Sequence, residues 1–220
     1  MTVRVDVILP CRDEEAALPS VLAGVPSVAG YHAIVVDNGS TDGTAAVAAE
    51  HGATVVPEPT PGYGAAVHAG LLRSDADVVC VADGDGSMSL EHVPELVQLL
   101  LAGQADLVVG RRVPVTRGAF PWHARLGNAA LAGLLRRRGL AVRDLAPLRV
   151  GWRSQLLDLG VTDRGFGYPL ELLVRSGQAG WRISEVPVDY HPRAAGTRSK
   201  VTGSVRGTAR AVRDMARVLR

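Results

Sequence analysis

Short apolar runs rich in valine alternate with amphipathic helical patterns through the first half of this chain, and this alternation limits the fold more than any other feature. It predicts strands at residues 3–9, 33–36, 53–56, 78–82 and 107–109, with Pro10 closing the first, and helices at residues 14–23, 41–50, 64–73 and 90–102. Strands that are joined through helices favour a mainly parallel sheet with helices on both faces. We therefore predict an α/β fold, in which ligands bind beyond the carboxyl ends of the strands.

The second half of the sequence has a less regular pattern. It predicts a loop at residues 111–120, a helix at 122–138, an extended segment at 144–150, a helix at 166–176, a strand at 181–190, a polar loop at 192–200 and an amphipathic helix at 201–220. A chain of 220 residues is long enough for one sizeable core and too short for two ordinary domains. We predict a single domain over residues 1–220, with its two parts divided at residue 110.

Charge is balanced over the whole chain but not at its end. The formal net charge is +2, which argues against nucleic acid as a partner. The last 28 residues contain one acid, Asp214, and eight basic residues: Arg193, Arg198, Lys200, Arg206, Arg210, Arg213, Arg217 and Arg220. A basic end beside a balanced body indicates a local anionic partner, such as phosphate or a membrane surface.

The sequence gives no sign of export or of a membrane span. Its first residues lack the apolar stretch and the small-residue cleavage site of a signal peptide, and no apolar run approaches the roughly 20 residues that cross a bilayer. We expect a cytoplasmic protein which, if it works at the cell membrane, lies on the inner face. Cys11 and Cys80 are isolated within apolar runs, and we interpret them as buried free thiols.

The segment Asp83-Gly84-Asp85 directly follows the predicted strand at residues 78–82. Two carboxylates one residue apart on a turn can face the same hard cation, and such cations take one or two carboxylates together with phosphate oxygens. Glycines on both sides of Asp85 let the backbone approach a ligand closely. A polar turn before the next helix explains the same residues without a metal, so the motif alone leaves both interpretations open.

Other polar groups also follow predicted strands or begin helices. Asp37 ends the second strand, where an acid can accept hydrogen bonds from a nucleotide, although a tight turn with an N-cap fits as well. Gly64 begins a predicted helix, whose N-terminus could face a phosphate or a base. Arg193 and Lys200 flank a glycine-containing loop that could close over a diphosphate or remain a solvated charged segment.

In combination, these segments resemble the family 2 glycosyltransferases of the GT-A fold, and most of all their dolichyl- or polyprenyl-phosphate sugar synthase branch. The motifs that carry the resemblance follow the family's order. They are residues 9–15, 36–44 and 62–70, Asp83-Gly84-Asp85, Gly110-Arg111-Arg112, and residues 144–149, 168–171, 185–188 and 193–203. Each motif alone is weak, but their shared order over nearly the whole chain is specific.

The resemblance implies a nucleotide-diphosphate sugar donor and Mg²⁺ or Mn²⁺ as the cofactor. It assigns the nucleotide to residues 1–110 and the acceptor to residues 111–220. The implied donor-binding residues are Pro10, Arg12, Glu14, Asp37, Gly64, Asp83, Arg111, Arg193 and Lys200, and the implied metal ligands are Asp83 and Asp85. Four positions depart from the family pattern: Cys11 replaces a frequent tyrosine, Asp13 a common asparagine, Asn38 an aspartate, and Ser87 a glutamine that is often a further metal ligand.

The implied reaction is an inverting transfer of a sugar from a UDP- or GDP-sugar to an acceptor, and a polyprenyl phosphate at the membrane surface is the first candidate. Such a phosphate is already an anion, whereas a hydroxyl acceptor needs a base. The candidate catalytic residues are Asp85, together with Glu171 and Asp144 as bases, although either of the last two could be a structural acid. The final predicted helix could rest on an anionic membrane or dock in the core. Its apolar residues at helical spacing are Val205, Ala209, Val212, Ala216 and Leu219.

Three alternatives remain. The first is a soluble glycosyltransferase that uses a small hydroxyl acceptor, such as a phosphorylated acid. The second is a nucleotidyltransferase, which usually has a glycine-rich basic signature near the first strand that residues 10–15 lack. The third is a non-catalytic protein that keeps the fold, which the presence of both Asp83 and Asp85 disfavours. The sequence leaves a homodimer open.

Overall fold

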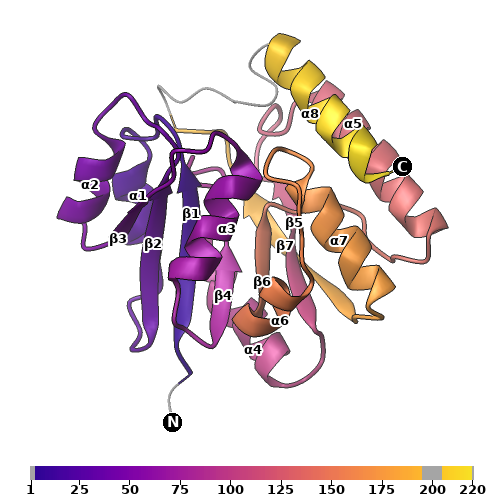
Figure 1. The fold of residues 1–220 in the computed structure, drawn as a ribbon, viewed down its shortest axis with the longest axis horizontal. Helices are drawn as coiled ribbons and strands as arrows, with labels where there is room; N and C mark the ends of the chain where they lie inside the picture. The colour runs from indigo at the N-terminus through magenta and orange to yellow at the C-terminus, as the bar shows by residue number, and fades with distance from the viewer. Residues whose placement is uncertain (1–2, 195–204, 220) are drawn as a thin grey trace.

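The computed structural model describes residues 3–194 and 205–219, and its centre is a seven-stranded sheet with the strand order β3-β2-β1-β4-β6-β5-β7 (Figure 1). The strands are β1 (Val5–Cys11), β2 (Tyr31–Asp37), β3 (Thr54–Pro57), β4 (Val78–Val81), β5 (Leu107–Pro114), β6 (Leu148–Trp152) and β7 (Ile183–Tyr190). β6 runs antiparallel to both of its neighbours, and the other strand pairs are parallel. The predicted α/β fold with a mainly parallel sheet is confirmed, and both halves of the chain contribute strands to this one sheet.

Helices cover both faces of the sheet (Figure 1). On one face pack α1 (Leu18–Ala23), α2 (Thr44–Glu50) and α4 (Val93–Leu101), the last preceded by the 3-10 turn η1 (Leu90–His92). On the other face pack α3 (Tyr63–Arg73), α5 (Trp122–Arg137), α6 (Arg153–Asp158) and α7 (Tyr168–Gln178), and α8 (Val205–Val218) lies against α7. No helix within the described ranges is long and apolar enough to cross a membrane.

The inner strand β1 separates two apolar cores. Val7 and Leu9 pack into the core beneath α1 and α4, whereas Ile8 packs into the core beneath α3 and α7. A strand that is buried on both faces needs apolar residues at every position, which is why its sequence is a continuous apolar run. Both cysteines are buried and free, as predicted.

Two predicted strand ends were wrong. The predicted loop at residues 111–120 begins only after Pro114, because β7 pairs with β5 as far as Pro114 and supplies hydrogen-bond partners there. Pro10 does not close β1, which continues to Cys11. The missing N–H of Pro10 leaves no gap in the ladder, because β4 pairs with β1 only as far as Ile8.

The close packing of α3 on β1 gives a test of the fold. An added Cβ at Gly70 would lie 2.4 Å from Cγ2 of Ile8. We expect Gly70→Ala to lower the free energy of unfolding by about 1–3 kcal/mol, because overpacking outweighs a gain in helix propensity of about 1 kcal/mol. Gly127→Ala in α5 is the matched control, since nothing lies within 4 Å of its added Cβ, and it should be neutral or stabilising. Urea unfolding measures both variants, and equal effects would contradict the packing described here.

Candidate active site at the carboxyl ends of the strands

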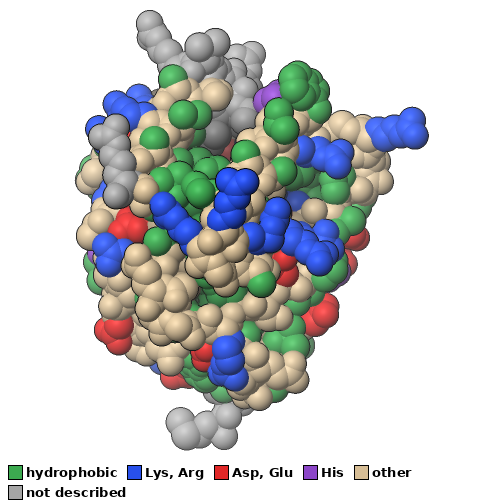
Figure 2. Space-filling view, turned by 90° about the vertical axis from the view of Figure 1, so that its right-hand side faces the viewer, with side chains coloured by type: hydrophobic (Ala, Val, Ile, Leu, Met, Phe, Trp, Pro, Cys, Tyr) green, Lys and Arg blue, Asp and Glu red, His purple; other side chains and the backbone are tan. Residues whose placement is uncertain are grey.

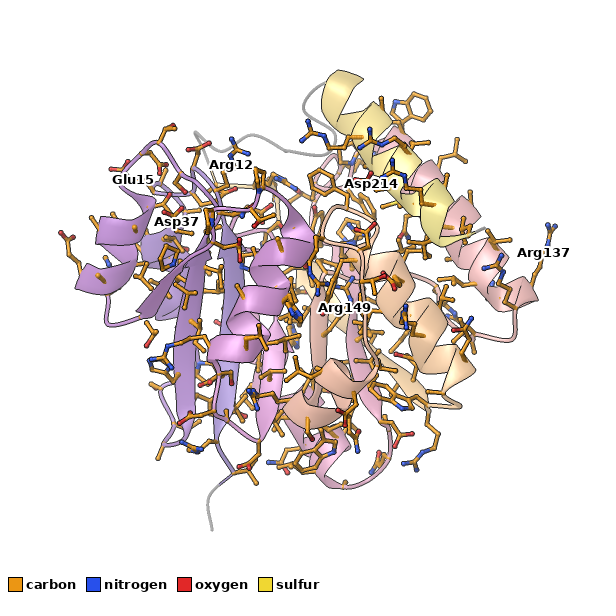
Figure 3. All side chains as sticks on the ribbon, in the orientation of Figure 1. Arg12, Glu15, Asp37, Arg137, Arg149 and Asp214 are labelled. Carbon is orange, nitrogen blue, oxygen red and sulfur yellow. The ribbon has the colours of Figure 1, made fainter. Side chains whose placement is uncertain are left out.

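The loops that leave the carboxyl ends of β1, β2 and β4 carry most of the predicted site residues. Because β2 and β4 flank β1, this is the point where the strand order changes direction, and open α/β sheets bind ligands at such a point. Figure 3 shows Arg12 and Asp37 at this edge of the sheet. Arg12 is exposed, Pro10 is partly buried and Glu14 is buried. The structure therefore brings these four predicted nucleotide-binding residues to one edge.

The loops after β1 and β2 are tied together by reciprocal hydrogen bonds. Asp13 accepts through Oδ1 from the backbone N–H of Thr41 at 2.8 Å. Glu15 accepts through Oε2 from the backbone N–H of Gly43 at 2.8 Å. These bonds hold the first residues of the helix predicted at residues 14–23 in a turn, so that α1 begins four residues later than we predicted.

The side chain of Asn38 joins the end of β2 to the segment before α3. Its Nδ2 donates to the carbonyl oxygens of Glu58 and Thr60, and its Oδ1 accepts from the backbone N–H of Gly62. A carboxylate could accept here but not donate, which explains why an asparagine replaces the aspartate of the family pattern. Asp37, the neighbour of Asn38, stays partly exposed at the strand end.

The start of α3 packs against backbone carbonyl groups. The N–H groups of Gly64 and Ala65 donate to the carbonyl oxygens of Gly165 and Arg164. An added Cβ at Gly64 would lie 2.4 Å from the carbonyl oxygen of Asp163, so the glycine permits this close approach. These contacts argue against our prediction that Gly64 and the helix N-terminus bind a phosphate or a base, because the donors already have partners.

The segment Asp83-Gly84-Asp85 forms the turn that follows β4. An added Cβ at Gly84 would lie 2.3 Å from Sγ of Cys11, so the turn packs closely on the end of β1. Asp85 is buried; its Oδ1 accepts from the backbone N–H of Ser87, and its Oδ2 lies 3.0 Å from Nη1 of Arg193. The structure thus brings Arg193, predicted for the diphosphate, to the predicted metal motif, whereas Lys200 lies outside the described residues.

The charge of Asp85 makes ionisation of Asp83, in the same turn, less favourable. Burial raises the pKa of Asp83 to about 6, and the charge of Asp85 acts in the same direction. The guanidinium groups of Arg193, Arg149 and Arg112 lower the pKa of Asp83, but their effect is smaller than the combined effect of burial and Asp85. A bound cation would relieve this accumulation of negative charge.

The oxygen donors at this turn fit Mg²⁺ or Mn²⁺ bound together with a phosphate. Such cations take one or two protein carboxylates and fill their remaining positions with phosphate and water oxygens. Within residues 3–194 and 205–219, no group of three or more His, Cys, Asp and Glu side chains is arranged to hold a metal. Ser87 adds a buried hydroxyl two residues after Asp85, and this hydroxyl has no hydrogen-bond partner in the described part of the chain.

Asp144 is held by Arg112, an arginine of the Gly110-Arg111-Arg112 motif for which the sequence indicated no role of its own. Arg112 donates through Nε to Oδ2 at 2.9 Å and through Nη2 to Oδ1 at 2.6 Å. Burial acts to raise the pKa of Asp144, but the hydrogen bonds and charge of Arg112 outweigh it and hold this pKa below its usual range. Arg111, predicted to meet a phosphate, is partly exposed on β5.

Glu171 holds the loop that contacts the start of α3. Its carboxylate accepts from the backbone N–H groups of Thr162 and Asp163 and from Nε of Arg175, the last at 2.6 Å. Burial acts to raise the pKa of Glu171, but these hydrogen bonds lower it. A carboxylate with a lowered pKa and occupied oxygens is a weak base. The role of Glu171 or Asp144 as a base stays a prediction, and these contacts argue against it.

Sequence reasoning missed two polar side chains near the metal motif. Arg149 is 3% exposed in β6, and Tyr63 begins α3. Both interact electrostatically with Asp83, because Arg149 lowers the pKa of Asp83 and Asp83 raises the pKa of Tyr63. The single arginine within the apolar run of β6 was the signal that the sequence offered. A charge in a buried strand is costly unless it is paired and hydrogen-bonded, so such a residue indicates a partner.

Comparison with known proteins identifies the family. A profile described as Glycosyl transferase family 2 matches residues 6–152. The chain belongs to this family. An uncharacterized glycosyltransferase of Mycobacterium tuberculosis is 56% identical over 98% of this chain and 97% of its own length. A dolichyl-phosphate hexose transferase of Haloferax volcanii is 34% identical over 87% of this chain and 85% of its own length. The prediction of a family 2 glycosyltransferase is confirmed.

A solved structure supports the same fold. Glucosyl-3-phosphoglycerate synthase from Mycobacterium tuberculosis, crystallised with Mn²⁺, uridine diphosphate and glucosyl-3-phosphoglycerate, is 27% identical with a TM-score of 0.75. The match covers 99% of this chain and 78% of that one. The predicted GT-A fold is confirmed by this likeness.

The raised pKa of Asp83 predicts how its replacement changes stability. In the folded protein this pKa is about 6, above the usual value of 3.8, so ionising Asp83 destabilises the fold as pH rises between these values. We expect Asp83→Asn, without metal, to be more stable than the parent protein by about 1–3 kcal/mol above pH 6, and the difference to vanish below pH 4. Thermal unfolding across this pH range measures it, and a variant that is less stable at pH 7.5 would contradict the stated cause.

Proposed function

We propose that this chain is an inverting glycosyltransferase that moves a sugar from a UDP- or GDP-sugar to a polyprenyl phosphate. The observation that carries the proposal is the pair Asp83 and Asp85 at the carboxyl end of β4, with Arg193 held at Asp85. The solved relative binds Mn²⁺ and uridine diphosphate, and the archaeal relative is a dolichyl-phosphate hexose transferase. Membership of the family supports glycosyl transfer, and the donor and acceptor are our inference.

The residues of the site have separate roles in this proposal. Asp37 and Arg12 bind the nucleoside at the ends of β2 and β1, and Asp83 and Asp85 hold the divalent ion. When bound, that ion would neutralise the diphosphate as it leaves. Arg193 carries a charge that the diphosphate can use once the metal takes its place at Asp85.

The state of the candidate bases favours an acceptor that is already an anion. Asp144 and Glu171 both have lowered pKa values and both are occupied by hydrogen bonds. A hydroxyl acceptor would need one of them to take a proton, whereas a lipid phosphate needs no base. The soluble alternative, with a phosphorylated acid as the acceptor, keeps support from the solved relative bound to glucosyl-3-phosphoglycerate.

The helices α5 and α8 present apolar side chains among arginines, and we propose that this apolar–basic surface rests on an anionic membrane. Trp122 is 76% exposed, Leu126 64% and Val212 63%. Arg125 and Arg213 are exposed beside them in the sequence. Figure 2, viewed from the side of these helices, shows basic and apolar side chains gathered on this face. Basic helices with exposed aromatic and leucine side chains bind at the headgroup boundary.

The docking of α8 leaves three residues of the predicted apolar stripe outside, whereas Leu219 packs against the core under α3 and α7. The buried positions of this helix are Ala211 and Asp214. The predicted stripe residues Ala209, Val212 and Ala216 are exposed. A helix that packs on the protein through one face and exposes apolar residues on another has a surface that can contact a membrane or a partner protein. This arrangement supports the membrane over the core as the partner of that stripe.

A panel of UDP- and GDP-sugars with Mn²⁺ or Mg²⁺ tests the donor and the metal. We expect at least one donor to raise the melting temperature only with metal, and nucleoside diphosphate to be released when undecaprenyl phosphate is added. Asp85→Asn should lower this turnover roughly 100-fold or more, because it removes a metal ligand. Asp106→Asn is the matched control, since Asp106 pairs with Arg182 on the surface away from the site, and it should keep full turnover.

Two outcomes would contradict the proposal in different ways. If no sugar nucleotide stabilises the protein in the presence of metal, the donor and the metal are both wrong. If turnover occurs with phosphoglyceric acid and not with undecaprenyl phosphate, the soluble alternative is right and the lipid acceptor is wrong.

Binding to phosphatidylglycerol vesicles tests the apolar–basic surface. Replacing Trp122 and Leu126 together by alanine should weaken binding roughly tenfold or more, because both side chains would leave the lipid interface. Leu72→Ala is the matched control: Leu72 is also 60% exposed but lies on α3. Flotation with these vesicles measures the difference, and equal binding by the double variant and the parent would exclude this surface.

A further inference from the structure

Arg149 is a buried cation whose donors are only partly used. Its Nη2 donates to the carbonyl oxygen of Leu145 at 2.6 Å. Its Nε and Nη1 are buried and have no hydrogen-bond partner among residues 3–194 and 205–219. A buried donor without a partner destabilises a protein, and more so when the group is charged. A stable fold keeps such a group when a ligand completes its hydrogen bonds.

Acidic side chains of the site region are committed elsewhere. Asp144 pairs with Arg112, Glu171 pairs with Arg175, and Asp85 pairs with Arg193. Within the described ranges, no carboxylate lies within ion-pair distance of Arg149. Among the described residues, Asp83 is the acid whose pKa Arg149 influences, and it does not form an ion pair with Arg149.

The position of Arg149 in the sheet places it next to the metal motif. In the register of the sheet, Arg149 of β6 lies opposite Val81 of β4. Side chains alternate between the two faces of a strand, so Asp83, two residues after Val81, continues on the same side as Arg149. The charge of Arg149 accordingly lowers the pKa of Asp83. Figure 3 shows Arg149 in the middle of the molecule, between α3 and α7.

Tyr63 adds a second unused group at the same place. Its hydroxyl is buried and lacks a hydrogen-bond partner in the described part of the chain. Burial raises the pKa of Tyr63, and both Asp83 and Arg149 are close enough to influence it, although the hydroxyl and the guanidinium do not meet in hydrogen-bonding geometry. The ring of Tyr63 packs edge-on against Tyr168 at the start of α7, with centroids 6.4 Å apart. The contact between the two rings positions Tyr63 beside Asp83.

Arg193 and Arg149 both lower the pKa of Asp83, but the residues packed around them belong to different cores. Ala194, next to Arg193, packs against the core under α1 and α4. Tyr63 and Tyr168 pack with the core under α3 and α7. Ala194 thus lies on the opposite face of the sheet from Tyr63 and Tyr168, and a diphosphate that pairs with Arg193 leaves Nε and Nη1 of Arg149 for another group.

We propose that Arg149 and Tyr63 form an oxyanion subsite beside Asp83, which binds a negatively charged oxygen group on one of the two reacting molecules. That group is either a carboxylate on the transferred sugar or a phosphate on the acceptor, which share the chemistry that a guanidinium and a phenol hydroxyl recognise. The subsite rests on the proposed function, because it assigns a substrate class to the same site. It makes Arg149 and Tyr63 specificity-determining residues for the reaction.

The test compares Arg149→Met and Tyr63→Phe with the parent protein by calorimetry in the presence of Mn²⁺. UDP-glucuronic acid against UDP-glucose probes an acidic sugar, and inorganic phosphate added to the UDP complex probes an acceptor phosphate. We expect Arg149→Met to weaken one of these two anionic probes roughly 10- to 100-fold, and Tyr63→Phe to weaken the same probe less, while the affinity for UDP alone stays unchanged. The probe that loses affinity identifies which molecule carries the oxyanion.

Stability supplies a readout that a structural role would not give. Arg149→Met removes a buried charge with unused donors, so its melting temperature should equal or exceed that of the parent. Arg153→Met is the matched control: the Nε of Arg153 donates to the carbonyl oxygen of Leu71, and this variant should lose stability without a change in anion affinity. A structural arginine at position 149 would instead give a lower melting temperature and unchanged anion affinities, which would overturn the proposal.

The two proposals fail in distinguishable ways. If the parent protein binds no nucleotide with Mn²⁺, the proposed function fails, and phosphate binding by the parent and by Arg149→Met still tests the subsite. If nucleotides bind but both anionic probes bind equally to the parent and to Arg149→Met, the subsite fails and the proposed function stands.

Discussion

The parallel hydrogen bonding of β1 to β2 on one side and to β4 on the other is the constraint on which the rest of the structure depends. It brings the carboxyl ends of three strands that are distant in the sequence to one edge of the sheet. The turns that follow them must then share a small volume, and they do so through hydrogen bonds between Asp13 and Thr41 and between Glu15 and Gly43. The polar side chains of the candidate site are thus held by the same hydrogen bonds that join the loops after β1 and β2.

A second set of contacts connects this edge to the other half of the chain. Glu171 fixes the loop at residues 162–163, the following residues accept from the start of α3, and Gly62 before α3 donates to Asn38 at the end of β2. α8 joins the same loop, because the backbone N–H of Phe166 donates to its only acid, Asp214. The helix α8 therefore contacts the loop that also packs against the start of α3.

Charge decides what this framework can bind. The two aspartates after β4 are too close and too buried to be ionised easily together, and the raised pKa of Asp83 reflects this. Arg193 offsets part of that charge through its ion pair with Asp85, and Nε and Nη1 of Arg149 have no hydrogen-bond partner among the described residues. A site with crowded carboxylates and underused cations suits a divalent metal and anionic substrates at once.

The sequence by itself determined the fold class, the family and the place of Asp37, Asp83 and Asp85 at strand ends, because strand periodicity and the turn at each strand end are local properties. It misjudged the end of β5 and the start of α1, because those boundaries depend on hydrogen bonds to β7 and to the loop after β2. Only the tertiary structure decided that Asp144 and Glu171 are bound by arginines and that Arg149 is not matched by an acid. Those facts depend on which charges meet across the sheet, and distances between residues far apart in the chain are set by packing rather than by sequence spacing.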